Sequence, residues 1–387
     1  MIQRPAYLKK LSNGLRRSPV TALLGPRQCG KTTLARMFGD DLEATYFDLE
    51  SQPDLLRLQN PELMLGGLSG LVVLDEIQVM PELFRDLRVL VDRPGNRAHF
   101  LILGSASPGI VRNVSETLAG RVEFIELSGF DLNEIGGDSW ERLWLRGGFP
   151  RSFLAESDED SQVWREGFIK TFLERDIPQL GISIPARAMR RFWTMLAHYH
   201  GQTFNGSELA RSMGLSDKTV RSYLDILTGT FMVRQLQPWF ENMKKRQVKA
   251  PKIYFRDSGL LHSLLGLNDT SSLAGHPKVG ASWEGFALEQ FLKAVQPADA
   301  FFWAAHSGAE MDLFFLYRGQ RHGVEVKYNE APKITRSMRI AFEDLHLDKM
   351  WIVYPGKDSY PVDKKITVWP LSNISDLPEH MDGLKSS

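Results

Sequence analysis

The chain has 387 residues, 43% of them hydrophobic and 24% charged, which is enough for two or three domains with their own cores. Its 47 basic and 47 acidic residues cancel, which argues against a strongly basic nucleic-acid coat but allows a local basic patch. One cysteine, Cys29, excludes an internal disulfide, and no apolar run approaches the roughly 20 residues that span a bilayer. The amino terminus lacks the apolar core of a signal peptide. We therefore expect a cytoplasmic protein with no membrane partner.

The first predicted elements surround a glycine-rich loop. Residues 6–15 have helical spacing and stop at Asn13-Gly14, residues 20–24 read as a strand, and residues 33–38 read as a helix. The segment between strand and helix reads Gly-x-x-x-x-Gly-Lys-Thr, whose backbone N–H groups can wrap a phosphate at a helix N-terminus. An accidental glycine-rich turn would not need that flanking strand and helix. We therefore predict an ATP-binding loop made by Gly25, Pro26, Arg27, Gln28, Cys29, Gly30, Lys31, Thr32 and Thr33.

Three residues of this loop have separate expected roles. Lys31 should reach the β- and γ-phosphates, and the Thr32 hydroxyl should ligate Mg²⁺. Cys29 is expected to contribute its backbone N–H, with redox regulation through its thiol as the alternative.

A second signal follows about 45 residues after the loop. Residues 44–49 read as a strand and residues 51–65 as helical with a break at Pro61. The apolar run 71–74 then reads as a strand buried in a parallel sheet, and it ends at Asp75-Glu76. We predict that Asp75 holds Mg²⁺ and that Glu76 is the general base for the attacking water. Solvated acids at a strand end are the alternative.

Two further strands complete the predicted sheet. Residues 99–105 end at Ser105, with Ser107 behind it, and Ser105 is the candidate to contact the γ-phosphate or the lytic water. A turn without a catalytic role is the alternative. Residues 122–127 alternate apolar and acidic residues, and Arg121 stands just before them. Arg121 is either a finger for the γ-phosphate of its own or a neighbouring subunit, or a structural salt bridge.

This order of elements predicts an α/β sandwich with a mostly parallel sheet. The segments GPRQCGKTT, VVLDEIQ, LILGSAS and LAGRVEFIELSGF resemble prokaryotic AAA-type P-loop ATPases that carry a C-terminal domain of unknown function. LRGGFP, FLERDIPQLGI, KIYFRDSGLLHSLLGL and WEGFALE also resemble that family, so the resemblance covers nearly the whole chain. It implies ATP binding and hydrolysis without supplying a substrate.

The middle of the chain is predicted to be helical. The acidic stretch 156–160 reads as a linker and residues 161–180 as a helix of a small lid. Residues 205–224 read as helix, glycine turn, helix, with Ser207 and Ser216 as caps, and residues 232–239 alternate as a wing strand would. Lys218, Thr219 and Arg221 would contact DNA if this is a winged helix that reads DNA, and the basic run 244–249 lies close by. The alternatives are a packing or protein-interaction module and a solvated loop.

The last part of the chain carries a carboxylate set. Glu284 lies on a predicted helix, Asp312 lies near the start of a predicted strand, and Glu325 and Lys327 share one face of the next strand across a turn at Gly319. Two or three carboxylates can share Mg²⁺ while the lysine positions water. The set resembles the PD-(D/E)XK nucleases, with Glu284, Asp312 and Glu325 as metal ligands and Asp312, Glu325 and Lys327 as catalytic residues. A structural charge network or a site that only binds nucleic acid is the alternative.

Together these readings predict three domains: an AAA-type P-loop ATPase at 1–150, a helical lid and winged helix at 151–270, and an α/β nuclease-like domain at 275–387. The leading hypothesis is a Mg²⁺-dependent ATPase that controls a nuclease-like domain acting on or binding DNA. The second is an ATP-dependent switch whose C-terminal domains bind proteins or pair subunits without cutting. The sequence does not decide between them, nor does it fix the oligomeric state, the pathway or whether Arg121 acts in trans.

Overall fold

The computed structural model describes residues 2–40, 42–105, 114, 116–240, 249–305 and 308–383. The chain forms two compact units. Unit 1 comprises Met1–Gly129 with Gly229–Phe231, and unit 2 comprises Phe130–Thr228 with Met232–Ser387. The predicted middle and C-terminal parts therefore lie in one compact body.

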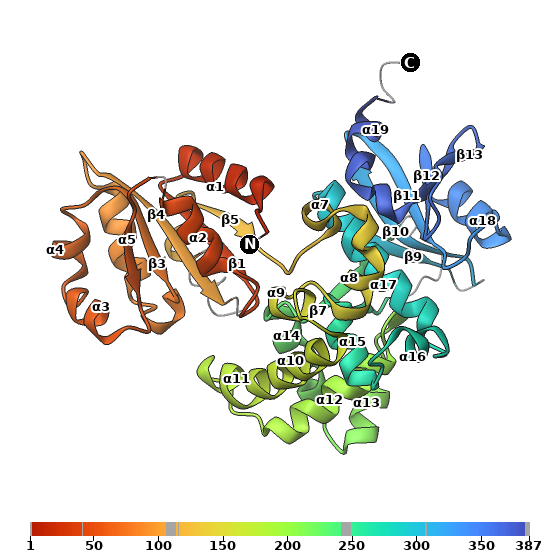
Figure 1. Ribbon diagram of the computed structural model, residues 1–387, viewed down its shortest axis with the longest axis horizontal. Helices are drawn as coiled ribbons and strands as arrows, with labels where there is room; N and C mark the ends of the chain where they lie inside the picture. The colour runs from red at the N-terminus through yellow and green to blue at the C-terminus, as the bar shows by residue number, and fades with distance from the viewer. Residues whose placement is uncertain are drawn as a thin grey trace. The chain divides into compact units, whose positions relative to one another are not determined.

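Unit 1 is an α/β fold around a five-stranded sheet (Figure 1). Its described elements are α1 Pro5–Arg17, β1 Val20–Gly25, α2 Lys31–Asp40, β2 Thr45–Asp48, α3 Gln52–Arg57, α4 Pro61–Leu65, β3 Ser69–Asp75, the 3₁₀ turn η1 Ile77–Val79, α5 Leu83–Asp92, β4 Arg97–Ser105 and β5 Val122–Glu126.

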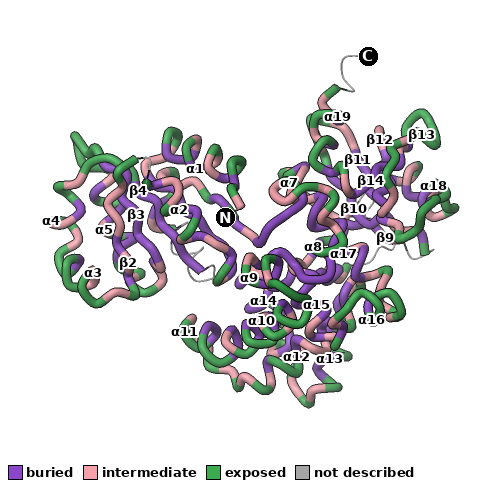
Figure 2. The backbone as a smooth tube through the Cα atoms, in the orientation of Figure 1, coloured by how far each residue is buried: buried purple, intermediate pink, exposed green. Residues whose placement is uncertain are grey.

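The unit 1 sheet has the order β2-β3-β4-β1-β5, and every neighbouring pair is parallel. All six residues of β1 are buried, as are the last five of β3, because both faces of a parallel sheet are covered (Figure 2). The carboxyl ends of the strands meet at one edge, where Gly25 lies opposite Ser105. This edge brings together the ends of β1, β3 and β4, which carry the predicted ATP site, and the predicted parallel α/β fold is confirmed.

The first helix is longer than predicted. It continues through Gly14 to Arg17, although Asn13-Gly14 is a stop signal in sequence. A Cβ on residue 14 would lie 3.0 Å from Thr21 Oγ1, so the glycine allows close packing of α1 on β1 rather than ending the helix.

Unit 2 combines helices with a nine-stranded sheet. Its helices are α7 Leu132–Ile135, η2 Gly137–Ser139, α8 Trp140–Arg146, α9 Pro150–Phe153, α10 Asp158–Thr171, the π-helical η3 Phe172–Asp176, α11 Ile177–Gln179, α12 Ala186–His198, α13 Gly206–Met213, α14 Asp217–Gly229, α15 Ser258–Leu265, α16 Thr270–Ala274, α17 Val279–Val295, α18 Arg336–Asp344, η4 Leu371–Asp376 and α19 Leu377–Gly383. Its strands are β6 Gln202–Thr203, β7 Val233–Pro238, β8 Lys252–Phe255, β9 Ala300–Ala304, β10 Glu310–Tyr317, β11 Gln320–Val326, β12 Lys349–Tyr354, β13 Tyr360–Asp363 and β14 Ile366–Pro370.

The unit 2 sheet crosses the predicted boundary between the middle and C-terminal domains. Its strand order is β13-β14-β12-β11-β10-β9-β7-β8-β6. The strands β7 and β8 pair antiparallel, and β7 pairs parallel with β9 through Gln237–Phe301 and Pro238–Phe302. The strands of the middle part thus extend the sheet that carries the carboxylates.

In the middle part, one predicted linker is helical, and the predicted helix-turn-helix is present. The stretch 156–160 is not a free linker, because α10 begins at Asp158 with Ser157 as its cap. In the middle part, α13 and α14 are joined at Gly214, which has φ 70° and ends α13 in the left-handed conformation. Asn205, not the predicted Ser207, caps α13, whereas Ser216 does accept from the Thr219 N–H at 3.1 Å.

Candidate functional sites

The phosphate loop connects β1 to the N-terminus of α2 in unit 1. Gln28 and Gly30 have positive φ angles of 62° and 100°, which curl the loop. A Cβ on Gly25 would lie 2.0 Å from the Leu127 carbonyl oxygen, so only glycine fits where the loop meets the chain after β5. The tight curl places this backbone at the helix start, as phosphate binding requires.

Two basic residues hold the loop through its carbonyl groups. Lys31 Nζ donates to the carbonyls of Gly25 at 3.1 Å and Pro26 at 2.8 Å. Arg4, from the residues before α1, donates to the Cys29 carbonyl at 3.2 Å. Arg4 was not predicted, because nothing in the local sequence links it to a loop residue that lies 25 positions later.

The remaining loop side chains differ in exposure. Cys29 is fully buried, its Sγ lies 3.4 Å from the Leu127 carbonyl oxygen, and burial raises the pKa of its thiol. Arg27 pairs with Glu50 at 3.3 Å, while Thr33 points outward on α2. The buried thiol lacks the exposure of a redox sensor.

Thr32 and Asp75 meet beside the loop. Thr32 Oγ1 donates to Asp75 Oδ2 at 2.8 Å, and the hydroxyl of Tyr46, on β2, donates to the same oxygen. Hydroxyl and carboxylate oxygens are the ligands that Mg²⁺ prefers, so this pair fits the metal. Tyr46 was not predicted, and only the neighbouring position of β2 and β3 brings it to Asp75.

Glu76 is held in a left-handed backbone conformation at the end of β3, with φ 56°. Its N–H donates to Asp75 Oδ1 at 2.9 Å, and Gln78 Nε2 donates to its carboxylate. Gln78 Oε1 in turn accepts from the Ser105 N–H at 3.3 Å. The Gln78 side chain therefore links Glu76 to the end of β4, a bridge that the sequence did not reveal.

Ser105 completes this edge. It is buried, and its Oγ has no hydrogen-bond partner among the described residues. Ser107 lies outside the described residues.

Arg121 lies at the amino-terminal ends of the unit 1 strands, opposite to the ends that carry the phosphate loop. It precedes β5, whereas the phosphate loop follows the parallel strand β1. Its guanidinium donates to both Asp92 carboxylate oxygens, at 2.7 and 2.8 Å. Within one chain this geometry matches the salt-bridge alternative and not a finger in its own ATP site.

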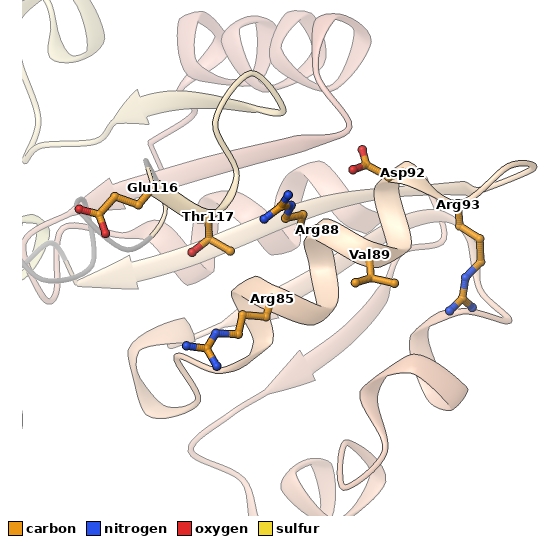
Figure 3. A pocket seen from close by; sticks show the side chains of 7 residues that line it. All are labelled: Arg85, Arg88, Val89, Asp92, Arg93, Glu116 and Thr117. Atoms are coloured by element: carbon orange, nitrogen blue, oxygen red, sulfur yellow. The ribbon is translucent and has the colours of Figure 1, made fainter.

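Asp92 also borders a hollow of about 750 Å³ beside α5, and its lining includes no residue of the phosphate loop. Figure 3 shows the side chains that line it: Arg85, Arg88, Val89, Asp92, Arg93, Glu116 and Thr117.

In unit 2 the predicted carboxylates come from three neighbouring elements. Glu284 lies on α17, Asp312 on β10 and Glu325 on β11. Asp312 Oδ2 accepts from the Val326 N–H at 2.9 Å, and Lys327 Nζ donates to Glu325 Oε1 at 2.6 Å. The antiparallel pairing of β10 with β11 thus brings Asp312, Glu325 and Lys327 to one region of the sheet.

Burial dominates the electrostatics of this set. Burial, followed by the charge of Asp312, raises the pKa of Glu284 to about 7 and the pKa of Glu325 to about 8. Glu325 Oε2 is buried without a hydrogen-bond partner in the described part of the chain.

Three further residues belong to this cluster and were not predicted: Lys252, Glu310 and Tyr254. Lys252, on β8, places Nζ 3.5 Å from Glu284 Oε1 and 3.9 Å from Asp312 Oδ1, and it also contacts Glu310. The Tyr254 hydroxyl donates to Glu284. Lys252 and Tyr254 come from the middle part of the sequence, and no motif connects them to a PD-(D/E)XK pattern.

Over the residues that the structure describes, no three or more His, Cys, Asp or Glu side chains gather as a metal-binding group. The predicted metal set of Glu284, Asp312 and Glu325 is therefore not gathered around a central position. The cause is visible in the contacts, since Lys252 lies between Glu284 and Asp312 and Lys327 holds Glu325.

At the predicted DNA-reading helix, Lys218 and Arg221 are exposed on α14. Arg221 pairs with Asp217 at 2.9 Å, which offsets part of its charge. Of the basic run, residues 244–248 lie outside the described residues. No described helix has both the length and the apolar character needed to cross a bilayer.

Three family matches divide the chain. An AAA domain matches residues 17–136, a domain of unknown function (DUF8612) matches 137–271, and a second domain of unknown function (DUF4143) matches 279–374. Two curated mycobacterial proteins, "Uncharacterized protein Rv2008c" of Mycobacterium tuberculosis and "Uncharacterized protein Mb2031c" of Mycobacterium bovis, are each 52% identical over 374 residues. These alignments cover 97% of this chain and 85% of each relative.

Solved structures with similar parts include the Walker-type ATPase PABY2304 of Pyrococcus abyssi. It is 14% identical, with a TM-score of 0.49 over 68% of this chain and 96% of that one. The RuvB Holliday junction branch migration motor of Thermotoga maritima is 18% identical, with a TM-score of 0.30 over 60% of this chain and 90% of that one.

Proposed function

Because this chain belongs to the family of the mycobacterial proteins Rv2008c and Mb2031c and contains an AAA-type P-loop ATPase domain, we propose that it hydrolyses ATP with Mg²⁺ at the phosphate loop. We further propose that the bound nucleotide controls the state of unit 2, the part of the chain that acts on a partner.

The contact that carries this proposal is the one between Thr32 and Asp75, at 2.8 Å. In it the loop and the acidic strand end meet as an ATPase needs them to, with two oxygen ligands ready for Mg²⁺. When bound, Mg²⁺ neutralises charge on the β- and γ-phosphate oxygens. The chain itself supplies the Lys31 ammonium and the loop N–H groups, which bind and orient the phosphates.

Glu76 is our candidate general base. It stands next to Asp75, and Gln78 holds its carboxylate in a fixed position near the end of β4. A held carboxylate can accept a proton from a water aligned with the γ-phosphate. Ser105, at the same edge, has a hydroxyl available to orient that water or the phosphate.

We expect Glu76→Gln to bind ATP normally while its hydrolysis rate falls by about 10²-fold or more, because the proton acceptor is lost. Lys31→Ala should lose ATP binding. Nucleotide binding and phosphate release, measured on both variants, distinguish these outcomes. Glu62→Gln, on exposed α4, is the matched control and should behave as wild type. Wild-type turnover by Glu76→Gln would remove Glu76 from the base position.

Arg121 remains a proposed finger only for a neighbouring subunit. In its own chain it pairs with Asp92 at the far edge of the sheet. A role in trans would therefore require a homo-oligomer in which Arg121 leaves Asp92.

For unit 2 we propose DNA as the partner. The order α12, β6, α13, α14, β7, β8 is that of a winged helix, and its second helix exposes Lys218 and Arg221. The pairing of Glu325 with Lys327 beside Asp312 supports a fold of the PD-(D/E)XK kind.

Cleavage of DNA is the second candidate for unit 2, and it rests on that same resemblance. The position of Lys252 among the carboxylates favours binding without cleavage, as does the absence of a gathered metal group in the described residues. An ATP-dependent switch that binds a protein or a second copy of the chain is the alternative to DNA.

A plasmid assay distinguishes cutting from binding. With Mg²⁺ or Mn²⁺, with and without ATP, we expect wild type to retard plasmid DNA on a gel without nicking it. Nicking that disappears in Asp312→Ala would establish the nuclease instead. Neither retardation nor nicking would favour the protein-binding switch. Lys218→Ala tests DNA binding by the second helix of the proposed winged helix. Loss of a phosphate contact should weaken the retardation of the plasmid and make it depend less on salt.

A further inference from the structure

The cluster on the unit 2 sheet holds a cation supplied by the chain itself. Lys252 opens β8, and its Nζ lies 5.5 Å from the centre of the Phe302 ring on β9. Its side chain is 5% exposed, so the ammonium is fixed among its neighbours rather than dissolved in water. A buried ammonium is stable only when paired.

The partners of this ammonium are the oxygens that a metal would use. Nζ contacts carboxylate oxygens of Glu284, Glu310 and Asp312, which come from α17 and β10. A divalent cation binds such oxygens at about 2.0 to 2.6 Å and needs several of them at once. It cannot take Glu284 and Asp312 together while an ammonium lies between them, and the two cations would also repel each other.

We propose that Lys252 stands in for a divalent metal ion, because its ammonium takes the carboxylate oxygens of this nuclease-like set that a metal would use. The four acidic side chains Glu284, Glu310, Asp312 and Glu325 face two ammonium groups, Lys252 and Lys327. Lys252 is then a structural cation that closes the site. An ammonium saturated by carboxylates neither activates water nor binds a phosphate oxygen as a metal does.

The second carboxylate oxygen of Glu325, Oε2, indicates that Lys252 suppresses the binding of another cation. Glu325 is 6% exposed, and its Oε2 has no hydrogen-bond partner among the described residues. Its other oxygen, Oε1, accepts a hydrogen bond from Lys327 Nζ. Buried carboxylate oxygens are ordinarily satisfied. Removing the Lys252 ammonium would leave Glu284 and Asp312 uncompensated beside this oxygen, which is an arrangement that attracts a cation.

The role of Lys252 does not depend on ATP hydrolysis, so it can be tested on the full chain without nucleotide. Mn²⁺ is titrated into the protein and followed by the loss of the electron paramagnetic resonance signal of free Mn²⁺. We expect Lys252→Met to bind one additional Mn²⁺ at the cluster, because a repelling charge is removed. Its affinity there should be at least about tenfold higher than the affinity of wild type for Mn²⁺ at the same place. Lys349→Met, on β12 of the same sheet, is the control and should match wild type.

Two further variants make the result specific. Lys252→Met with Asp312→Asn should return to the wild-type level, because the new site would use the Asp312 carboxylate. Lys252→Arg keeps a cation and should gain no site. Failure of folded Lys252→Met to gain Mn²⁺ would overturn the proposal.

Mn²⁺ uptake by wild type and by Asp312→Asn tests the proposal even if Lys252→Met does not fold. Equal Mn²⁺ uptake by these two proteins supports a cluster closed by Lys252. Uptake by wild type that Asp312→Asn abolishes would show that the cluster binds metal despite the ammonium, and the proposal would be wrong.

Discussion

Gln78 shows how a single side chain can connect two strand ends. Its amide donates to Glu76 and accepts from the Ser105 N–H, so it fixes the carboxylate and joins β3 to β4. A Cβ on Gly104 would lie 3.4 Å from Gln78 Oε1 and 3.0 Å from Ile77 Cγ2, so the glycine keeps room for this bridge. The sequence predicted Glu76 from its place after an apolar strand, but the bridge depends on the positive φ of Glu76, which no pattern signals.

We predict that Gln78→Ala lowers the ATP hydrolysis rate about tenfold while the affinity for ATP is little changed. One hydrogen bond contributes about 0.5–1.5 kcal/mol, and its loss frees the Glu76 carboxylate from its position. Steady-state phosphate release against ATP concentration measures both quantities. Gln59→Ala, on the exposed turn between α3 and α4, is the control. An unchanged rate would mean that the bridge has no part in hydrolysis.

Among the elements, the strands of unit 1 were the most predictable. Their apolar runs are long and each ends in a motif, so β1, β3, β4 and β5 appear within two residues of their predicted bounds. The stretch 156–160 was misread because acidic residues suit both a linker and the first turn of a helix, where they interact favourably with the helix dipole. The join of β7 to β9 was unpredictable, since a parallel pairing of residues far apart leaves no local pattern.

A buried ion pair connects these elements in unit 2. Glu289 on α17 accepts from Arg234 on β7, with Nη2 and Oε2 3.0 Å apart, and Arg256 Nε lies 3.7 Å from the same oxygen. Glu289 is 3% exposed. The pair ties the central helix to the strands from the middle part.

Glu289→Ala should lower the free energy of unfolding by about 3–5 kcal/mol, because it removes the buried carboxylate that pairs with Arg234 and Arg256. Denaturant unfolding of the full chain, followed by tryptophan fluorescence, measures the change. Glu330→Ala removes an exposed glutamate from the same unit and should stay within about 0.5 kcal/mol of wild type. A similarly small effect for Glu289→Ala would show that the pair adds no stability.

For the molecule as a whole, the buried ionisable groups set the pH dependence of stability. Burial lowers the pKa of His200 and of His262 to about 3. Below pH 6.5 the unfolded state therefore binds more protons at these two rings than the folded state does, and stability falls as the pH is lowered. Above that pH the raised pKa values of Glu284 and Glu325, about 7 and 8, dominate. The folded state binds more protons than the unfolded state in this range, so stability falls as pH rises.

We therefore predict a melting temperature that declines from pH 6.5 to pH 8.5, with a smaller decline for Glu325→Gln, which no longer titrates. Thermal unfolding in buffers of matched ionic strength measures both proteins. A wild-type melting temperature that rises over this range would contradict the raised pKa values of the two carboxyl groups.

The sequence predicted some of the site residues and gave no sign of others. The phosphate loop and Asp75-Glu76 follow strand ends, and their chemistry is local, so their residues could be named. Lys252 and Arg4 could not, because each reaches its partners through the tertiary fold rather than through spacing. The PD-(D/E)XK pattern named Asp312, Glu325 and Lys327 correctly as neighbours, yet it contains no position for the lysine that changes their charge balance.

The sheet shared by the middle and C-terminal parts also has a consequence for synthesis on the ribosome. Strand β7 ends at Pro238, and its partner β9 begins at Ala300. At roughly 5–20 residues per second, the edge of β7 waits roughly 3 to 12 seconds before its neighbour is made. During that time it is an unpaired strand edge open to other chains. Association with a chaperone, or premature pairing between nascent chains, is therefore most to be expected while residues 239–299 are being added.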